Sequence, residues 1–183
     1  LLDESAAPAD LDRATTAIFY SISNTQAGLR GVSFGDSLIK RVVECLHEEF
    51  PRLKTFATLS PIPGLRAWLG KHAPAELLQA WEAAPDLAEK SPPRVALKQW
   101  AARYLAQELQ DGKPLDAVAR FHLGNGARVE RLNWAADPSA KGLKQSYGLM
   151  VNYLYDLKRL DKHRAMLAQA KIPTARAIKD LYL

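Results

Sequence analysis

The segment from residue 15 to residue 59 decides the fold, and it reads TTAIFYSI (15–22), SNTQAGLRGVSFG (23–35), an amphipathic stretch to about Phe50, and KTFATL (54–59). The first and last strings are β-branched and aromatic, which is typical of strands, and we expect residues 15–22 to form a buried strand. Asp36 or Ser37 can cap a helix whose apolar residues share one face, and Pro51 ends it. The segment therefore predicts a βαβ-like unit with a glycine-rich loop.

The chain has 183 residues, enough for one domain with its own core, and a formal net charge of +5. Most of that charge lies between Asp156 and Leu183, which hold seven basic and three acidic residues. We expect a linker over residues 1–14, one domain over 15–183, and within it a basic helical tail over 156–183 that Pro173 breaks. Because the remaining residues are nearly neutral, the sequence argues against a nucleic-acid-binding protein.

The single cysteine, Cys45, excludes an intramolecular disulfide, argues against a cysteine-based metal site and suits a reducing compartment. No apolar run reaches the length of a membrane span. The acidic N-terminal residues resemble neither a signal nor a transit peptide, and the C-terminal DLYL is not a peroxisomal signal. We expect a bacterial-type cytoplasmic location, with no membrane partner.

Beyond the first unit, the sequence alternates helical and strand-like segments. SPIPG (60–64) forms a rigid elbow because Ser60 and Ile62 precede prolines. We expect helices at 65–72, 97–109 and 115–120, strands at 128–134 and 149–155, and a polar loop over 137–148.

The glycine-rich loop before Asp36 is the first candidate site. Backbone N–H groups at a helix N-terminus can cradle a pyrophosphate, and Arg30 would add a charged contact. A strand-to-helix turn that simply needs glycine explains the same residues. The spacing matches neither a P-loop nor GxGxxG.

His122 and Ser60 are the next candidates, and each has two interpretations. In FHLGNGA (121–127), His122 is either a hydrogen-bonded core residue or a general acid, since imidazole titrates near neutral pH. Ser60 is either the N-cap of the next helix or a polar group in a site. The other histidines (His47, His72 and His163) are predicted to be solvated, Cys45 to be packed, and the four tryptophans to lie in the core.

Four strings, in this order, resemble the malonyl-CoA decarboxylase family: TTAIFYSISNTQAGLRGVSFGDSLIKRVV, FATLSPIPG, ARFHLGNGARVERLNWAADPS and GLMVNYLYDL. The resemblance covers about Thr15 to Leu157. It implies an α/β (α+β) chain with the GNAT-like acyltransferase fold, a mixed central sheet flanked by helices. It also implies that an all-helical domain and the first strands of the GNAT-like domain precede this chain.

The resemblance implies a catalytic pair of His122 and Ser60. Ser21 and Tyr155 correspond to active-site positions, and Asn125 is a neighbour of the site. The residues that correspond to the CoA-binding loop are Arg30, Gly31, Val32, Ser33, Phe34, Gly35 and Asp36. Some family members carry glutamate where this chain has Ser33, so that glutamate is not essential here unless another acid replaces it.

The implied reaction is decarboxylation of malonyl-CoA to acetyl-CoA and CO2, in fatty acid or malonate metabolism. His122 would protonate the thioester enolate, and Ser60 would orient the departing carboxylate. No metal, biotin or pyridoxal is implied, coenzyme A being part of the substrate, and we expect a homo-oligomer. Two alternatives are a GNAT-type N-acyltransferase and a non-enzymatic module whose basic tail binds nucleic acid, anionic lipid or a partner helix.

Overall fold

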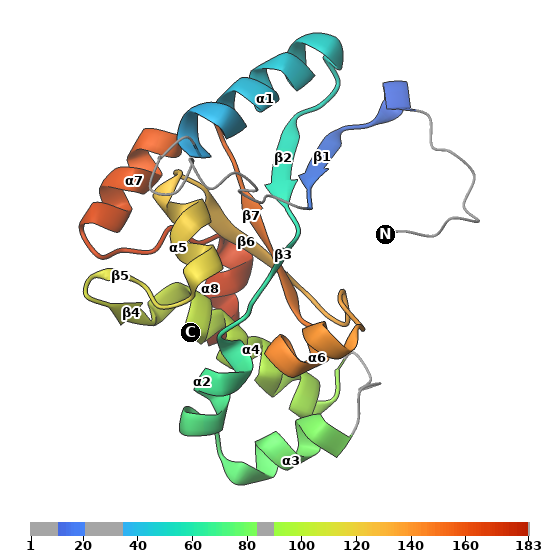
Figure 1. The fold of residues 1–183 in the computed structure, drawn as a ribbon, viewed down its shortest axis with the longest axis vertical. Coiled ribbons are helices and arrows are strands. Elements are labelled where there is room, and N and C mark those ends of the chain that lie inside the picture. The colour runs from blue at the N-terminus through green and yellow to red at the C-terminus, as the bar shows by residue number, and fades with distance from the viewer. Residues whose placement is uncertain (1–10, 21–34, 84–89, 183) are drawn as a thin grey trace, which may run out of the picture.

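The computed structural model describes residues 11–20, 35–83 and 90–182, which form a five-stranded mixed sheet with helices on both faces (Figure 1). The sheet has the order β1-β2-β7-β3, with β6 also paired to β7. Its strands are β1 (Thr16–Phe19), β2 (Thr55–Thr58), β3 (Ser60–Pro61), β6 (Arg128–Asn133) and β7 (Met150–Leu154). Strands β2 and β3 follow each other along one edge of β7, and β6 runs antiparallel along its other edge.

The predicted βαβ unit is confirmed. Strand β1 pairs with β2 in parallel, from Thr16 opposite Thr55 to Phe19 opposite Thr58, and helix α1 (Gly35–Glu49) lies between them in sequence. The prediction that the first strand is buried is wrong. Among the described strands β1 has only β2 as a neighbour, and the side chain of Ile18 is 40% exposed.

The remaining described elements are mostly helices. They are η1 (Leu11–Arg13), α2 (Leu65–His72), α3 (Ala75–Ala83), α4 (Pro92–Gln107), the short hairpin β4 (Leu109–Gln110) and β5 (Lys113–Pro114), α5 (Ala117–Gly124), α6 (Ala140–Ser146), α7 (Leu160–Ala168) and α8 (Arg176–Tyr182). The three helices predicted at 65–72, 97–109 and 115–120 are all present. Helix α2 has the predicted bounds, whereas the ends of α4 and α5 are shifted. None of the described helices is long and apolar enough to cross a membrane.

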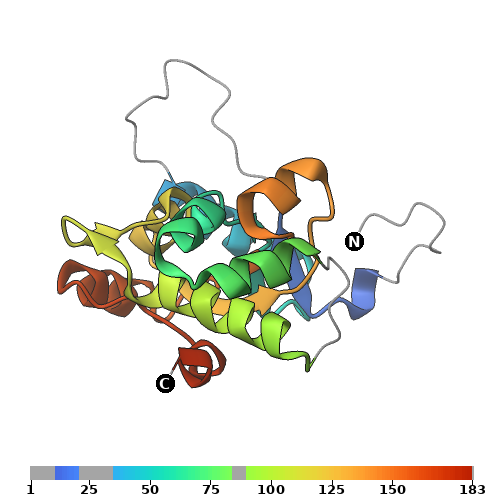
Figure 2. The same ribbon diagram turned by 90° about the horizontal axis from the view of Figure 1, so that it is seen from below.

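The core lies between the sheet and the helices that cover it. Helices α5 and α8 contact β6 from opposite faces of the sheet, and α4 packs against both α8 and β6 (Figure 2). Side chains with no more than 1% exposure fill this space: Leu97, Ala101, Leu105, Leu123, Val129 and Val151. Burying each large aliphatic side chain contributes roughly 1.5–3 kcal/mol.

The polar loop predicted at 137–148 contains helix α6. The Ser139 side chain accepts a hydrogen bond from the Gly142 N–H and so caps the helix. The helix ends at Ser146, and Tyr147 and Gly148 follow with positive φ angles of 53° and 77°. The prediction failed because a seven-residue helix is too short to display an apolar stripe, although its N-cap serine could have been recognised.

The basic tail packs against the domain. Helices α7 and α8 are separated at Pro173 as predicted, and the Pro173 carbonyl accepts from the Val129 N–H of β6. His163, predicted to be solvated, is instead only 5% exposed, with Nδ1 2.9 Å from the carbonyl oxygen of Gly126. A Cβ on Gly126, whose φ is +87°, would lie 2.8–2.9 Å from Leu160. The start of the tail is therefore fitted closely to the turn that follows α5.

The other predictions for single residues have mixed outcomes. His47 and His72 are exposed, as predicted. Cys45 is also exposed, so the prediction that it packs is wrong: it lies on the outer side of α1. Of the tryptophans, Trp68 and Trp81 are buried, whereas Trp100 and Trp134 are half-buried at the border of the core.

Candidate active site

Ser60 lies where the elbow leaves the sheet. It is the first residue of β3, opposite Val151 of β7, and it is 5% exposed. Its Oγ donates to Thr58 Oγ1 at 2.8 Å and lies 3.2 Å from His122 Nε2. The N-cap of α2 is Gly64, so the interpretation of Ser60 as a helix cap is wrong.

His122 belongs to helix α5, which runs beyond the short helix predicted at 115–120. The Asp116 side chain caps this helix by accepting from the Val118 and Ala119 N–H groups at 3.0 and 2.9 Å. The cap fixes where the helix begins, and His122 follows in its second turn with 4% exposure. The helix thus points the imidazole at the sheet.

The imidazole joins two strands of the sheet through its two nitrogens. Nδ1 lies 2.8 Å from the hydroxyl oxygen of Tyr155, just beyond the end of β7, and Nε2 faces Ser60. The ring also stacks on Tyr153, with centroids 4.7 Å apart and an angle of 25° between the planes. Ser60, His122 and Tyr155, which are far apart in sequence, therefore form one hydrogen-bonded row.

Burial lowers the pKa of His122 to about 4. The charged imidazolium loses its hydration in this enclosed position, so the neutral form is favoured. The expectation of titration near neutral pH is therefore wrong for the protein as it stands, and at pH 7 the imidazole is neutral. An anion placed beside the ring would raise the pKa again.

Asn125 ends the same helix. It is the C-cap of α5 and 8% exposed, and its Nδ2 has no hydrogen-bond partner among the described residues. A buried amide donor without a partner costs about 1–3 kcal/mol. Asn125 therefore lies one helical turn beyond His122 with an unused donor, which suits a residue that contacts a ligand.

Ser21 and residues 30–34 (Arg30, Gly31, Val32, Ser33 and Phe34) lie outside the described residues. Gly35 and Asp36 open helix α1, which places a helix N-terminus directly after the predicted phosphate loop. The CoA-binding role of residues 30–36 stays a prediction.

Several polar residues around the row were not predicted. Thr58 contacts Ser60 directly, and it could have been found because alternate residues of a strand point to the same face. Asp116 is 2% exposed, and its Oδ2 lies 3.4 Å both from the Gly64 N–H and from the Tyr104 hydroxyl. Burial raises the pKa of Asp116 and of Tyr104. This carboxyl group thus links the elbow that carries Ser60 to the helix that carries His122.

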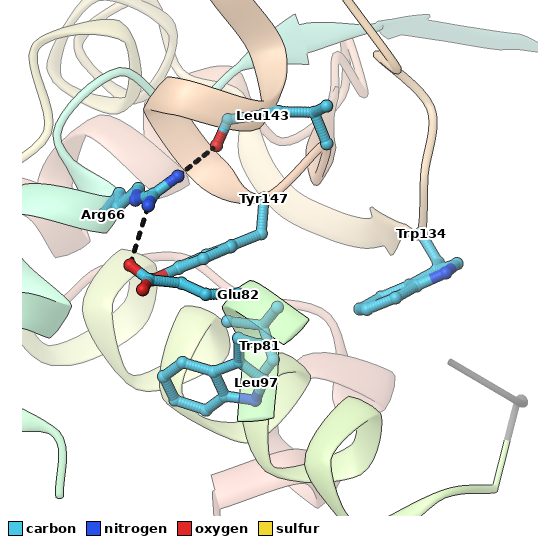
Figure 3. Close-up of a pocket in the computed structure, with 7 residues that line it drawn as sticks. All are labelled: Arg66, Trp81, Glu82, Leu97, Trp134, Leu143 and Tyr147. Carbon is cyan, nitrogen blue, oxygen red and sulfur yellow. Dashed lines mark hydrogen bonds and ion pairs between the residues drawn. The ribbon is translucent and has the colours of Figure 1, made fainter. Parts of the chain in front are cut away.

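A separate pocket of about 370 Å³ lies between α2, α3, α4 and α6 (Figure 3). The Arg66 side chain, at its border, pairs with Glu82 at 2.8 Å, donates to the Leu143 carbonyl and lies over the ring of Tyr147. Its charge is already matched within the protein, and no residue of the Ser60–His122 row lines this pocket. The candidate active site is therefore the row, not this pocket. Among the described residues, no three His, Cys, Asp or Glu side chains form a group able to hold a metal ion.

Comparison with solved structures supports the fold that the resemblance implied. The loading GNATL domain of CurA from Lyngbya majuscula matches 80% of this chain and 57% of that domain, with a TM-score of 0.50 and 15% identity. At that identity the match concerns the fold alone, and it agrees with the mixed sheet flanked by helices described above. The GNAT-like fold class is confirmed.

Closer matches carry one family name. A crystal structure of malonyl-CoA decarboxylase from Agrobacterium vitis is 45% identical, covers 98% of this chain and 48% of its own, and has a TM-score of 0.87. The mitochondrial malonyl-CoA decarboxylase of Rattus norvegicus is 42% identical in an alignment 179 positions long, which covers 80% of this chain and 36% of the rat protein. The chain thus spans less than half the length of these relatives.

The family model of the malonyl-CoA decarboxylase C-terminal domain matches residues 1–183. With the close likeness in sequence and structure to these relatives, the match shows that the chain belongs to the malonyl-CoA decarboxylase family.

Proposed function

We propose that this chain carries the active site for decarboxylation of malonyl-CoA to acetyl-CoA and CO2. The observation that carries the proposal is the buried row of Ser60, His122 and Tyr155, with its 3.2 and 2.8 Å contacts, in a member of this family. The row offers hydroxyl groups and one imidazole within a small space. Those groups suit a reaction in which a carboxylate leaves and a carbanion takes up a proton.

The thioester itself is the electron sink of the reaction. When the bond between Cα and the carboxylate breaks, its electron pair moves into the thioester and CO2 departs, leaving an enolate. Hydrogen-bond donors at the thioester oxygen stabilise this state, and each is worth about 3 kcal/mol. We expect backbone N–H groups near the end of β1 and the loop that follows it to supply them.

His122 is proposed to protonate Cα of the enolate. The neutral imidazole of the free protein takes up a proton from solvent when the malonyl carboxylate lies beside it, because an opposite charge within about 4–6 Å favours the imidazolium. The proton then leaves Nε2 for Cα, which gives acetyl-CoA and restores the neutral ring. Substrate binding and acid formation would thus be coupled.

Ser60 is proposed to hydrogen-bond the carboxylate and hold it out of the thioester plane, so that the breaking bond overlaps the π system. Tyr155, Ser21 and the unused amide of Asn125 would complete the polar contacts to the malonyl group. Residues 30–36 would hold the phosphates of coenzyme A at the N-terminus of α1.

The direct test measures acetyl-CoA and CO2 after malonyl-CoA is added to the intact protein, with no amine acceptor present. We expect the two products in equal amounts. A protein that turns over acyl-CoA only when an amine is supplied would be an acyltransferase instead. A crystal grown with coenzyme A would show whether the pyrophosphate binds at residues 30–36.

A further inference from the structure

Beside Ser60, the regular backbone hydrogen bonds between β7 and the strands β2 and β3 are interrupted, although the register of the strands does not change. Ala57 lies opposite Leu154 and, three residues later, Ser60 lies opposite Val151, so both strands advance equally. Between these pairs the Tyr153 N–H donates to the side chain of Thr58, at 3.2 Å, rather than to its carbonyl. The Thr58 carbonyl accepts instead from Asn152 Nδ2 at 2.6 Å. Two side chains thus replace the missing ladder hydrogen bonds.

At this interruption Thr58 contacts the candidate catalytic residue Ser60. It is fully buried, and its Oγ1 lies 2.8 Å from Ser60 Oγ because the two residues share one face of the strand. Its methyl group and Cβ branch suit a strand, and its hydroxyl also accepts from the Tyr153 N–H. That hydroxyl has Ser60 as its side-chain partner.

The direction of this hydrogen bond determines what Ser60 can offer to His122. A serine hydroxyl has one proton, and Thr58 Oγ1, at 2.8 Å, lies closer to Ser60 Oγ than His122 Nε2 does at 3.2 Å, which favours donation of this proton to Thr58. In this arrangement the Ser60 oxygen faces His122 Nε2 as an acceptor, and Nε2 carries the ring proton. On the other side of the ring, Nδ1 is left to accept from the Tyr155 hydroxyl.

We propose that Thr58 is a positioning residue that accepts the Ser60 proton and thereby holds neutral His122 in the tautomer protonated at Nε2. The consequence for catalysis rests on the proposed function: the Nε2 proton already lies on the side where the malonyl carboxylate and Cα would bind, and the proton taken up on substrate binding enters at Nδ1. The tautomer itself does not depend on any activity and is measured separately.

The first experiment reads the tautomer by ¹⁵N NMR of the intact protein labelled at histidine, in which protonated and unprotonated ring nitrogens are well separated. The His122 signals are assigned by their loss in His122→Asn. We expect Nε2 to be protonated in the wild type at pH 7. Thr58→Val, which keeps the branched shape, frees the Ser60 proton for Nε2, so the population should move toward the Nδ1-protonated tautomer. Thr58→Ser should keep the wild-type spectrum.

The second experiment is a double-mutant cycle on kcat for malonyl-CoA. Thr58→Val should lower kcat about tenfold with little change in KM, in line with the loss of one hydrogen bond. In a Ser60→Ala background the same substitution should have a clearly smaller effect, because the part that acts through Ser60 is gone and only the lost contact to the Tyr153 N–H remains. Thr55→Val, the same change at a half-buried position of the same strand, is the matched control and should leave kcat unaltered.

A wild-type ring protonated at Nδ1 would overturn the proposal, and so would a Thr58→Val spectrum identical to that of the wild type. Equal effects of Thr58→Val with and without Ser60 would show a merely structural role. If Thr58→Val does not fold, Thr58→Cys, with its weaker acceptor and similar size, takes its place in both experiments. Should the protein lack decarboxylase activity altogether, the NMR result would still decide the tautomer.

Discussion

The imidazole of His122 stacks on the ring of Tyr153, at 4.7 Å and 25°, so the face of the histidine is held by the strand next to Ser60. Tyr153 is fully buried and belongs to β7, which pairs with both β3 and β6. The ring therefore cannot tilt without disturbing the centre of the sheet. This contact and the two nitrogen partners fix His122 from three directions.

Replacing His122 with asparagine should abolish most of the decarboxylation. We expect kcat to fall at least about 100-fold, because a positioned general acid contributes roughly that much, while the KM for malonyl-CoA changes little. Acetyl-CoA formation by the intact protein is the measurement. His47→Asn, a change of the same kind on the exposed side of α1, should retain activity. Unchanged acetyl-CoA production by His122→Asn would refute the acid role.

His122 should also make stability depend on pH. Its pKa is near 6.5 in an unfolded chain and about 4 here, so between these values the unfolded state binds more protons. The stabilisation is complete above pH 6.5 and is lost as the pH falls toward 4, by about 2 kcal/mol between pH 6.5 and pH 5. Urea denaturation of the wild type and of His122→Asn, at pH 7 and pH 5, should show the larger loss in the wild type. Equal losses in both proteins would contradict the assignment.

Ser60→Ala should lower kcat less than His122→Asn does. The alanine removes a contact to the carboxylate but leaves the acid in place, so we expect a loss of about 10-fold to 100-fold with a smaller change in KM. Steady-state kinetics with malonyl-CoA tests this. An effect limited to coenzyme A affinity would mean that Ser60 does not act at the reacting carboxylate.

Gly64 should tolerate no side chain. A Cβ at this position would collide with the Tyr104 hydroxyl, which contacts Asp116, so Gly64→Ala should destabilise the protein by about 1–3 kcal/mol and lower kcat as the elbow shifts. Gly70→Ala is the matched control, because it lies in α2 with nothing within 4 Å of the added Cβ. It should raise stability by roughly 0.5–1 kcal/mol. Thermal unfolding of both variants compares them, and a harmless Gly64→Ala would contradict this account of the elbow.

Asp116→Ala should destabilise helix α5 by about 1–2 kcal/mol, since the cap to Val118 and Ala119 is lost. Asp116→Asn keeps one acceptor oxygen for the cap but loses the acceptor that faces the Gly64 N–H, so it should lose less stability than Asp116→Ala. Chemical denaturation measures both. If the two variants lose the same stability, the negative charge rather than the cap is what matters.

The sequence predicted the local elements well, because their signals are local. The βαβ unit and helix α2 follow from strand-like residues, caps and prolines within a few positions. The start of α5 was placed two residues early and its end four residues early, because Gly124 and Gly126 favoured a turn at His122, whereas Asp116 caps a helix that runs through Gly124. His163 looked solvated among charged neighbours, yet it reaches the Gly126 carbonyl from another part of the chain.

The site depends on pairing between distant segments, which residue patterns alone do not give. Ser60 and His122 are 62 positions apart, and Tyr155 is 33 positions beyond His122. Only the resemblance to a known family brought these residues together in advance. Thr58 was not predicted because buried threonines are common in strands. Only the structure shows that its hydroxyl contacts Ser60 and the Tyr153 N–H.

Because Leu160 fits closely against Gly126, deleting residues 158–183 would be a poor test of whether the basic tail binds a partner. Leu160 and His163 both contact Gly126, in the turn that follows α5, the helix that carries His122. A shortened protein would lose these contacts, and with them the orientation of α5, as well as the positive charge of the tail. Charge-reversing substitutions on the outward side of α7, rather than deletion, are therefore the way to ask whether the basic segment binds anything.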